Sequence, residues 1–249
     1  MELQELRKQQ ICKLLEITTD TFPRVIAFVD FGNVNHWFSD DDRDENGELL
    51  LDSQKLTINL EKLKDTLGSF STDTRFYYGH NPNNQGSQDF IKATRHIFGK
   101  SKVFTKPMQM IRHYLSDGEI SNNTREIKTD RGGRYILIPK CNFDVEISVD
   151  AVRLAEHYDT FCLLSGDSDF LHLIRYLRTE QKKKSLLVKG GYIQTALATE
   201  VELNGKIINA QDLKLYIAEK KQKSGFLRPD LADSQPESTG RTIQRSYKE

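Results

Sequence analysis

The chain has 249 residues, of which 37% are hydrophobic and 29% charged, enough for one large or two small globular domains. Basic and acidic residues number 36 each, so global charge gives no sign of a nucleic-acid partner. Three cysteines without a CxxC pair argue against a disulfide framework or a zinc knuckle. No signal-peptide core or membrane-length apolar run occurs, and we expect a cytoplasmic protein with no membrane partner.

Strands and helices alternate along most of the sequence. The predicted strands are short apolar or β-branched runs, at residues 25–29, 75–78, 102–105, 161–164, 184–188 and 206–208. The predicted helices carry apolar side chains at helical spacing, at residues 1–16, 53–67, 88–98, 144–154, 170–178, 192–202 and 210–220. Within this series Ser53 is the expected N-cap of its helix, and the acidic segment 39–46 is expected to be a solvated loop.

A different pattern occupies the region of about residues 109–140. Two strand-like runs, 124–128 and 134–138, flank the pair Gly132-Gly133, which predicts an inserted β-hairpin.

This order of elements predicts an α/β fold with three layers and a mostly parallel sheet. We assign the domain to residues 21–222, after an N-terminal helix within residues 1–20. Residues 223–249 are poor in apolar side chains and are predicted to be a disordered tail.

Four aspartates stand where predicted strands end or helices begin. Asp30 ends the first strand, Asp144 opens a helix, and Asp167 and Asp169 follow a later strand. Because the carboxyl ends of parallel strands share one edge of a sheet, we expect these acids to meet in one cleft, joined by Asn33.

Such a group of like charges raises the pKa of its members unless a cation compensates them. Carboxylate oxygens suit Mg²⁺ or Mn²⁺, which can orient a water and stabilise charge on a phosphodiester. The alternative is that Asp144, Asp167 and Asp169 are only helix caps or first-turn acids. Asp30 follows five apolar residues without a cap pattern, so the four together favour a metal site.

Three stretches of the sequence resemble the NYN domain family, a branch of the PIN-like nucleases. They are residues 28–33 (FVDFGN), 140–147 (KCNFDVEI) and 163–170 (LLSGDSDF). The resemblance spans about residues 24–210, except that the region between 81 and 140 departs from the family pattern.

The resemblance implies a PIN-like (Rossmannoid) fold and a metal-dependent endoribonuclease that uses Mg²⁺ or Mn²⁺. By position, Asp30, Asp144, Asp167 and Asp169 correspond to the metal-binding catalytic acids, and Asn33 assists them.

Asp150 also matches a recurrent acid of the family. It lies six residues after Asp144, about 240° around a helix, so we place it outside the ligand sphere.

The inserted segment is rich in basic side chains. They are Arg125, Lys128, Arg131, Arg134 and Lys140. At the entrance of an acidic cleft they would suit the phosphate backbone of a single-stranded RNA, although a plain solvated hairpin is the more ordinary explanation. Two other features stay open in the same way. Trp37 could stack on a base, but we favour a role as the anchor of its loop in the core, and Gly190 could approach a phosphate or form a plain turn.

Three functions compete for this pattern. A metal-dependent endoribonuclease uses all four acids, whereas a non-catalytic RNA-binding or regulatory module of the same fold could lack one. A phosphatase with an aspartate nucleophile is disfavoured, because Gly32 stands where its second aspartate is expected. The sequence leaves a homo-oligomer open.

Overall fold

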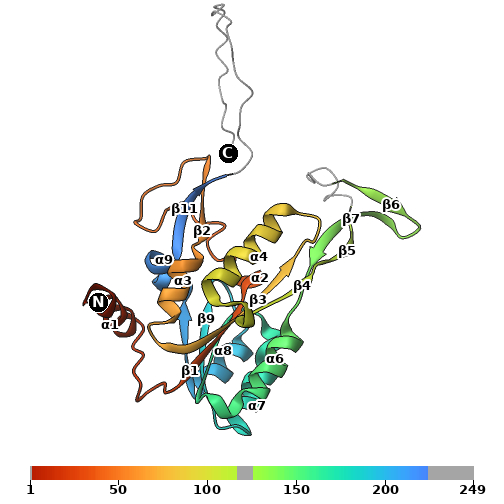
Figure 1. Ribbon diagram of the computed structural model, residues 1–249. Coiled ribbons are helices and arrows are strands. Elements are labelled where there is room, and N and C mark those ends of the chain that lie inside the picture. The colour runs from red at the N-terminus through yellow and green to blue at the C-terminus, as the bar shows by residue number, and fades with distance from the viewer. Residues whose placement is uncertain (1, 117–125, 224–249) are drawn as a thin grey trace, which may run out of the picture.

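The computed structural model describes residues 2–116 and 126–223 and is built on a six-stranded sheet (Figure 1). The strand order is β10-β9-β8-β1-β3-β4, and every neighbouring pair is parallel. The strands are β1 (Val25–Asp30), β3 (Ser71–His80), β4 (Val103–Pro107), β8 (Thr160–Leu164), β9 (Lys184–Lys189) and β10 (Gly205–Asn209). The predicted parallel α/β fold is therefore confirmed.

Helices cover both faces of this sheet. The first core contains side chains from α1 (Glu2–Leu14), α2 (Phe31–Val34), α3 (Leu60–Leu67), α4 (Gln85–Phe98) and α9 (Ala210–Ile217). The second core contains side chains from α6 (Asp144–Arg153), α7 (Leu171–Thr179) and α8 (Thr195–Glu202). β1 divides its buried residues between the two cores, with Ala27 and Val29 in one and Ile26 and Phe28 in the other. This alternation makes three layers.

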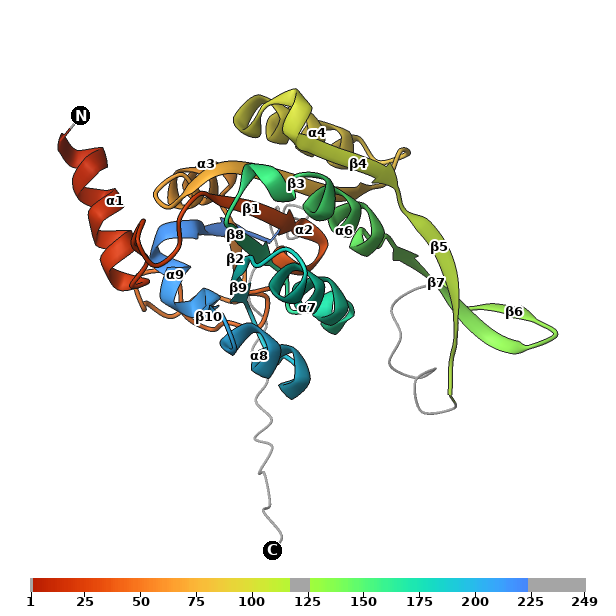
Figure 2. The same cartoon turned by 90° about the horizontal axis from the view of Figure 1, so that it is seen from below.

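The insertion is a three-stranded antiparallel sheet that projects from the α/β body as an arm (Figure 2). β5 (Gln109–Tyr114) pairs with β7 (Gly133–Lys140), and β7 pairs with β6 (Lys128–Asp130). The predicted hairpin is the β6–β7 pair, but its first strand was placed too early, at 124–128, because residues 126 and 127 precede the strand and pairing begins at Lys128. β5 is a third strand that the sequence pattern did not predict. Arg125 lies outside the described residues, as does the predicted disordered tail after residue 223.

The predicted helix from Ser53 is wrong in its first half. Residues Gln54–Ile58 form β2, and the helix α3 begins only at Leu60, where the side chain of Asn59 accepts a hydrogen bond from the Lys62 amide at 2.9 Å. The position of Leu56 fits both the helical spacing and the alternating spacing of a strand. A partner strand far along the chain decides that this segment is a strand.

That partner is β11 (Ala218–Gln222), which pairs antiparallel with β2. The predicted last helix therefore ends early, at Ile217, because the following residues are recruited into this two-stranded sheet. A pairing between segments about 160 residues apart leaves no local signal in the sequence.

The acidic segment 39–46 is not simply solvated. Asp44 is buried and accepts a hydrogen bond from the Lys220 ammonium at 2.7 Å. Asp41 pairs with Lys214 at 2.8 Å. These lysines of the C-terminal elements neutralise the loop and tie it to α9 and β11. Among the described helices, none has the length and hydrophobicity needed to cross a membrane.

Trp37 is a core residue that holds the loop after β1. Its indole is 7% exposed and packs against Gly190, where a Cβ atom would lie 2.0 Å from the indole Cδ1. Gly190 is therefore needed to admit this ring. The position next to it, Gly191, has nothing within 4 Å of an added Cβ.

This packing predicts unequal effects of two neighbouring substitutions. Gly190→Ala should lower the free energy of unfolding by about 1–3 kcal/mol, because the added methyl group overpacks the Trp37 site. Gly191→Ala is the matched control and should change it by less than about 0.5 kcal/mol. Urea denaturation followed by tryptophan fluorescence measures both, and equal effects would contradict the packing described.

Candidate metal centre

A cleft of about 440 Å³ opens at the carboxyl-terminal edge of the central sheet, and the four predicted aspartates and Asn33 all line it. β1 and β8 are neighbouring parallel strands, so the residues that follow them arrive side by side. Asp30 is the last residue of β1, whereas Asp167 and Asp169 belong to the turn and the short 3-10 helix Ser168–Phe170 after β8. Asp144 is the first residue of α6, a helix that packs on one face of the central sheet.

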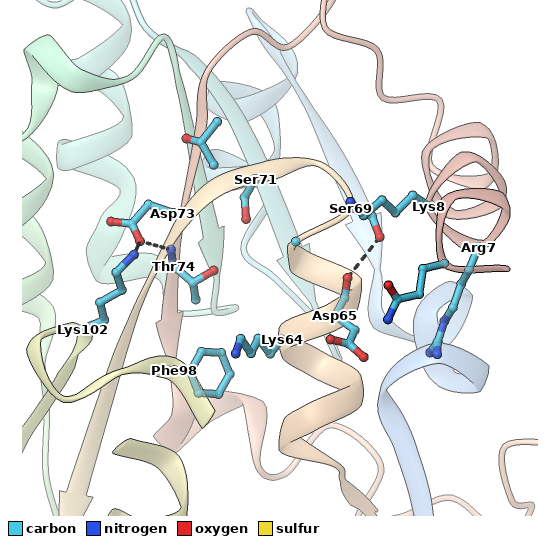
Figure 3. Close-up of a pocket in the computed structure, with 13 residues that line it drawn as sticks. Arg7, Lys8, Lys64, Asp65, Ser69, Ser71, Asp73, Thr74, Phe98 and Lys102 are labelled. Atoms are coloured by element: carbon cyan, nitrogen blue, oxygen red, sulfur yellow. Dashed lines mark hydrogen bonds and ion pairs between the residues drawn. The ribbon is translucent and has the colours of Figure 1, made fainter. Parts of the chain in front are cut away.

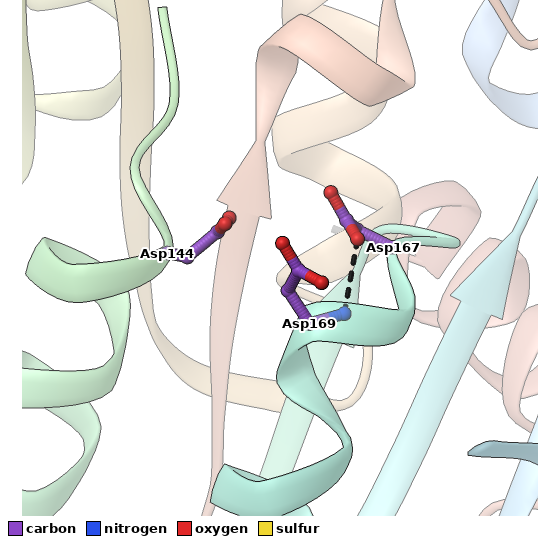
Figure 4. A group of neighbouring side chains, drawn as sticks. All are labelled: Asp144, Asp167 and Asp169. Carbon is purple, nitrogen blue, oxygen red and sulfur yellow. Dashed lines mark hydrogen bonds between the residues drawn. The ribbon is translucent and has the colours of Figure 1, made fainter. Parts of the chain in front are cut away.

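Three of the carboxylates form a tight group (Figure 4). One oxygen each from Asp144, Asp167 and Asp169 lies within 4.8 Å of the others. Opposite ligands of an octahedral Mg²⁺ are about 4 Å apart, so a small inward movement would let one ion contact all three. None of the three forms an ion pair with a side chain of the described residues. Their donor chemistry and spacing therefore fit a hard divalent cation.

Capping explains only one of these acids. The carboxylate of Asp167 accepts a hydrogen bond from the Asp169 amide at 3.0 Å and so caps the short helix. At the start of α6 it is Asn142 whose side chain accepts the Asp144 amide, at 2.9 Å. The carboxylates of Asp144 and Asp169 make no capping hydrogen bond, and they face the cleft instead.

Asp30 forms the inner wall of the cleft, next to this group. The Ser165 hydroxyl donates to its carboxylate at 3.0 Å and accepts the Asp167 amide at 3.2 Å. Burial raises the pKa of Asp30 to about 6, with a smaller contribution from the negative charges of Asp144 and Asp167, while the Ser165 hydrogen bond partly offsets the rise.

Ser165 is a positioning residue that the sequence analysis did not single out. It is fully buried, and its one hydroxyl links the end of β1 to the turn after β8. The signal was present, because a hydroxyl residue directly after a buried strand and two residues before an acid is well placed to bond that turn.

Burial also raises the pKa of Asp144, and the charges of Asp167 and Asp169 add to the rise. Lys106 acts in the opposite direction. Its ammonium lies 4.6 Å from the centre of the Phe143 ring and pairs with Glu146, so it is held beside the cleft.

Asn33 joins the two loops of the cleft. Its side-chain oxygen accepts hydrogen bonds from the Gly166 amide and from the Trp37 indole, both at 3.2 Å. Because this oxygen is committed to the scaffold, only the amide nitrogen of Asn33 is left for a ligand.

Asp150 lies outside the cleft, as its helical position predicted. Its side chain accepts hydrogen bonds from the Tyr77 hydroxyl at 2.7 Å and from the guanidinium groups of Arg75 at 2.9 Å and Arg153 at 2.6 Å. This buried network fastens α6 to β3 and so fixes the helix that begins with Asp144.

The predicted basic residues are not gathered at one point. Lys140 lines the cleft. Arg134 lies on β7 and Arg131 at the turn before it, both exposed and farther out along the arm, while Lys128 lies 3.7 Å from Glu126.

A second hollow, of about 380 Å³, lies at the opposite end of the sheet between α1, α3 and the beginning of β3 (Figure 3). Basic and acidic side chains are mixed there, and Asp73 is paired with Lys102. It lacks a group of unpaired acids, so it does not compete as a metal centre.

Comparison with known proteins identifies one family. The NYN domain family model matches residues 24–203, a range that includes all four acids of the cleft. No curated protein matches the chain. A solved structure of a protein of unknown function from Vibrio parahaemolyticus RIMD 2210633 is similar, with 17% identity over 81% of this chain and 99% of that chain and a TM-score of 0.49.

The raised pKa of Asp30 predicts how stability depends on pH in the absence of metal. The native state holds this proton up to about pH 6, whereas the unfolded chain releases it near 3.8, so stability is lost as the pH rises between these values. In EDTA at pH 7, Asp30→Asn should therefore raise the free energy of unfolding by up to about 3 kcal/mol.

At pH 4 the same substitution should have little effect on the free energy of unfolding. The comparison of wild type with variant at pH 4 is therefore the control for the comparison at pH 7. Thermal unfolding at pH 4 and pH 7 measures the difference. A variant that is less stable than wild type at pH 7 would show that Asp30 is not the strained acid described.

Proposed function

The chain belongs to the NYN domain family, a nuclease-type family of the PIN-like superfamily, and we propose that it is a metal-dependent endoribonuclease acting on single-stranded RNA. The observation that carries the proposal is the group of carboxylate oxygens of Asp144, Asp167 and Asp169 within 4.8 Å. Concentrated negative charge of this kind would repel a phosphodiester unless a cation lies between them.

Mg²⁺ or Mn²⁺ fits this donor set, with Asp144, Asp167 and Asp169 to hold it and Asp30 beside them. When bound, such an ion supplies charge stabilisation at the scissile phosphate and activation of the attacking water. The chain itself supplies the position of these carboxylates through Ser165, which fixes the relative position of the two loops.

Two neutral or basic groups are suited to hold the RNA backbone. The amide nitrogen of Asn33 can donate to a phosphate oxygen, because the oxygen of the same side chain is occupied by Gly166 and Trp37. Lys140 at the rim of the cleft supplies a cation for a neighbouring phosphate. The lining of the cleft continues to Met108 and Pro139 at the base of the arm. This extension supports cleavage inside an RNA strand rather than at its end.

Asp167→Asn should lower the rate of RNA cleavage by at least about 100-fold, since loss of even an outer partner of a metal ligand costs about 10–100-fold. The measurement is cleavage of a labelled single-stranded RNA with Mn²⁺ or Mg²⁺. EDTA should stop the wild-type reaction, and excess Mn²⁺ should restore it.

Asp212→Asn, which neutralises an exposed acid on α9, is the matched control and should cleave like wild type. Full cleavage by Asp167→Asn would contradict the catalytic assignment. RNA binding without cleavage by the wild type, at any metal concentration, would favour the regulatory module instead.

A further inference from the structure

One face of the arm carries a row of aromatic, apolar and basic side chains, of which Tyr135, Leu137 and Lys128 are half-buried and the others exposed. Directly opposed residues of antiparallel strands point to the same side of a sheet. Three successive ranks therefore share a face, namely Met110 with Pro139, Arg112 with Leu137, and Tyr114 with Tyr135 and Lys128. We call this set of residues the arm platform.

The platform is at least partly accessible to solvent along its length, although much of it is apolar. Met110 is 55% exposed and Tyr114 is 47% exposed, on a sheet only three strands wide. Exposed aromatic and apolar side chains that adjoin one another, rather than being scattered, are typical of a binding surface.

The aromatic part of the platform is held in one arrangement. The rings of Tyr114 and Tyr135 lie 5.8 Å apart, and the guanidinium of Arg112 lies 5.1 Å from the centre of the Tyr135 ring. Asp130 accepts hydrogen bonds from Arg112 at 2.6 Å and from the Tyr114 hydroxyl at 3.2 Å. At the turn, a Cβ on Gly132 would lie 2.8 Å from the Tyr114 ring, so the glycine is needed for that ring to lie there.

The platform is continuous with the acidic cleft. Met108 and Pro139 line the cleft, and Pro139 is paired with Met110 in the first rank. The described arm, residues 109–116 and 126–140, carries five lysine or arginine residues and two acids, whereas the whole chain is formally neutral. Arg112 and Lys128 lie on the platform face, where Asp130 binds Arg112 and Tyr114, whereas Arg134 and Lys140 alternate to the other face. A polyanion bound across the acidic centre would therefore meet an arm of net positive charge next to it.

We propose that the arm platform binds single-stranded RNA by stacking bases on Tyr114 and Tyr135, and so guides the strand into the cleft; this rests on the proposed function. Every base offers a face for stacking, and Arg112 adds a planar cation. A duplex is disfavoured because its base faces are covered by their neighbours. The five residues from Tyr135 to Pro139 are separated by four steps and span about 13 Å, roughly four stacked nucleotides.

The test is binding of a labelled 12-nucleotide oligouridine to Asp167→Asn protein in EDTA, where no cleavage is expected, measured by fluorescence anisotropy. Adding Tyr135→Ala should weaken binding about five-fold to a hundred-fold, the range measured for loss of one stacked base. Tyr135→Phe keeps the ring and should bind within two-fold of the parent. Tyr176→Ala, on α7, is the control for loss of an exposed aromatic ring elsewhere.

Met110→Glu keeps the tyrosines in place and adds a negative charge to the platform, so it should weaken binding about five-fold at low salt. Unchanged affinity in both Tyr135→Ala and Met110→Glu would overturn the proposal. Equal affinity for a blunt duplex would overturn it too. So would a dimer that sedimentation shows in the parent and not in Tyr135→Ala, because a second copy would then be the occupant.

Cleavage separates this proposal from the proposed function. Wild-type protein that cleaves RNA, with Tyr135→Ala cleaving and binding equally well, would remove the platform and leave the nuclease intact. Protein that cleaves no RNA but loses oligouridine binding in Tyr135→Ala would leave the platform intact and remove the nuclease.

Discussion

The repulsion between carboxylates at one edge of the sheet is the constraint around which the rest of the structure is arranged. Three carboxylate oxygens lie within 4.8 Å, and a fourth acid, Asp30, lies half-buried beside them with its pKa raised to about 6. Burying and crowding like charges destabilises a fold, so other interactions must hold the acids in place. This arrangement is what one expects of a site that gains stability only when a cation enters it.

The holding interactions form a short chain of contacts behind the cleft. Ser165 connects Asp30 to the turn that carries Asp167, and Asn33 connects the same turn to Trp37. The indole of Trp37 in turn requires the absence of a side chain at Gly190. Residues that never contact a ligand thus set the geometry of those that can.

The sequence predicted the central sheet well because its strands are short apolar runs and its helices have strong periodicity. It predicted the convergence of the acids for a topological reason, since β1 and β8 are neighbours and end at the same edge. It did not predict β2 and β11, because the local sequence pattern does not reveal a pairing with a strand about 160 residues away. It could not show that Asp44 is buried either, since that depends on Lys220 arriving from the C-terminal part.

The roles of the site residues were harder to predict than their position. Asn33 was expected to assist the acids in the cleft, but its side-chain oxygen is used by the scaffold. Asp167 caps a helix and faces the cleft at once, so the two explanations considered for it are not exclusive. The importance of the arm face emerged only from the strand register, because Arg112, Tyr114 and Tyr135 are not adjacent in sequence.

We propose that these acids gather to hold a divalent cation. The most direct test is a crystal soaked in Mn²⁺, with data collected for anomalous scattering. We expect a manganese peak coordinated by Asp144, Asp167 and Asp169, and the same map shows whether Asp30 is a ligand. An empty cleft at saturating Mn²⁺, or manganese bound only to other acidic residues, would contradict it.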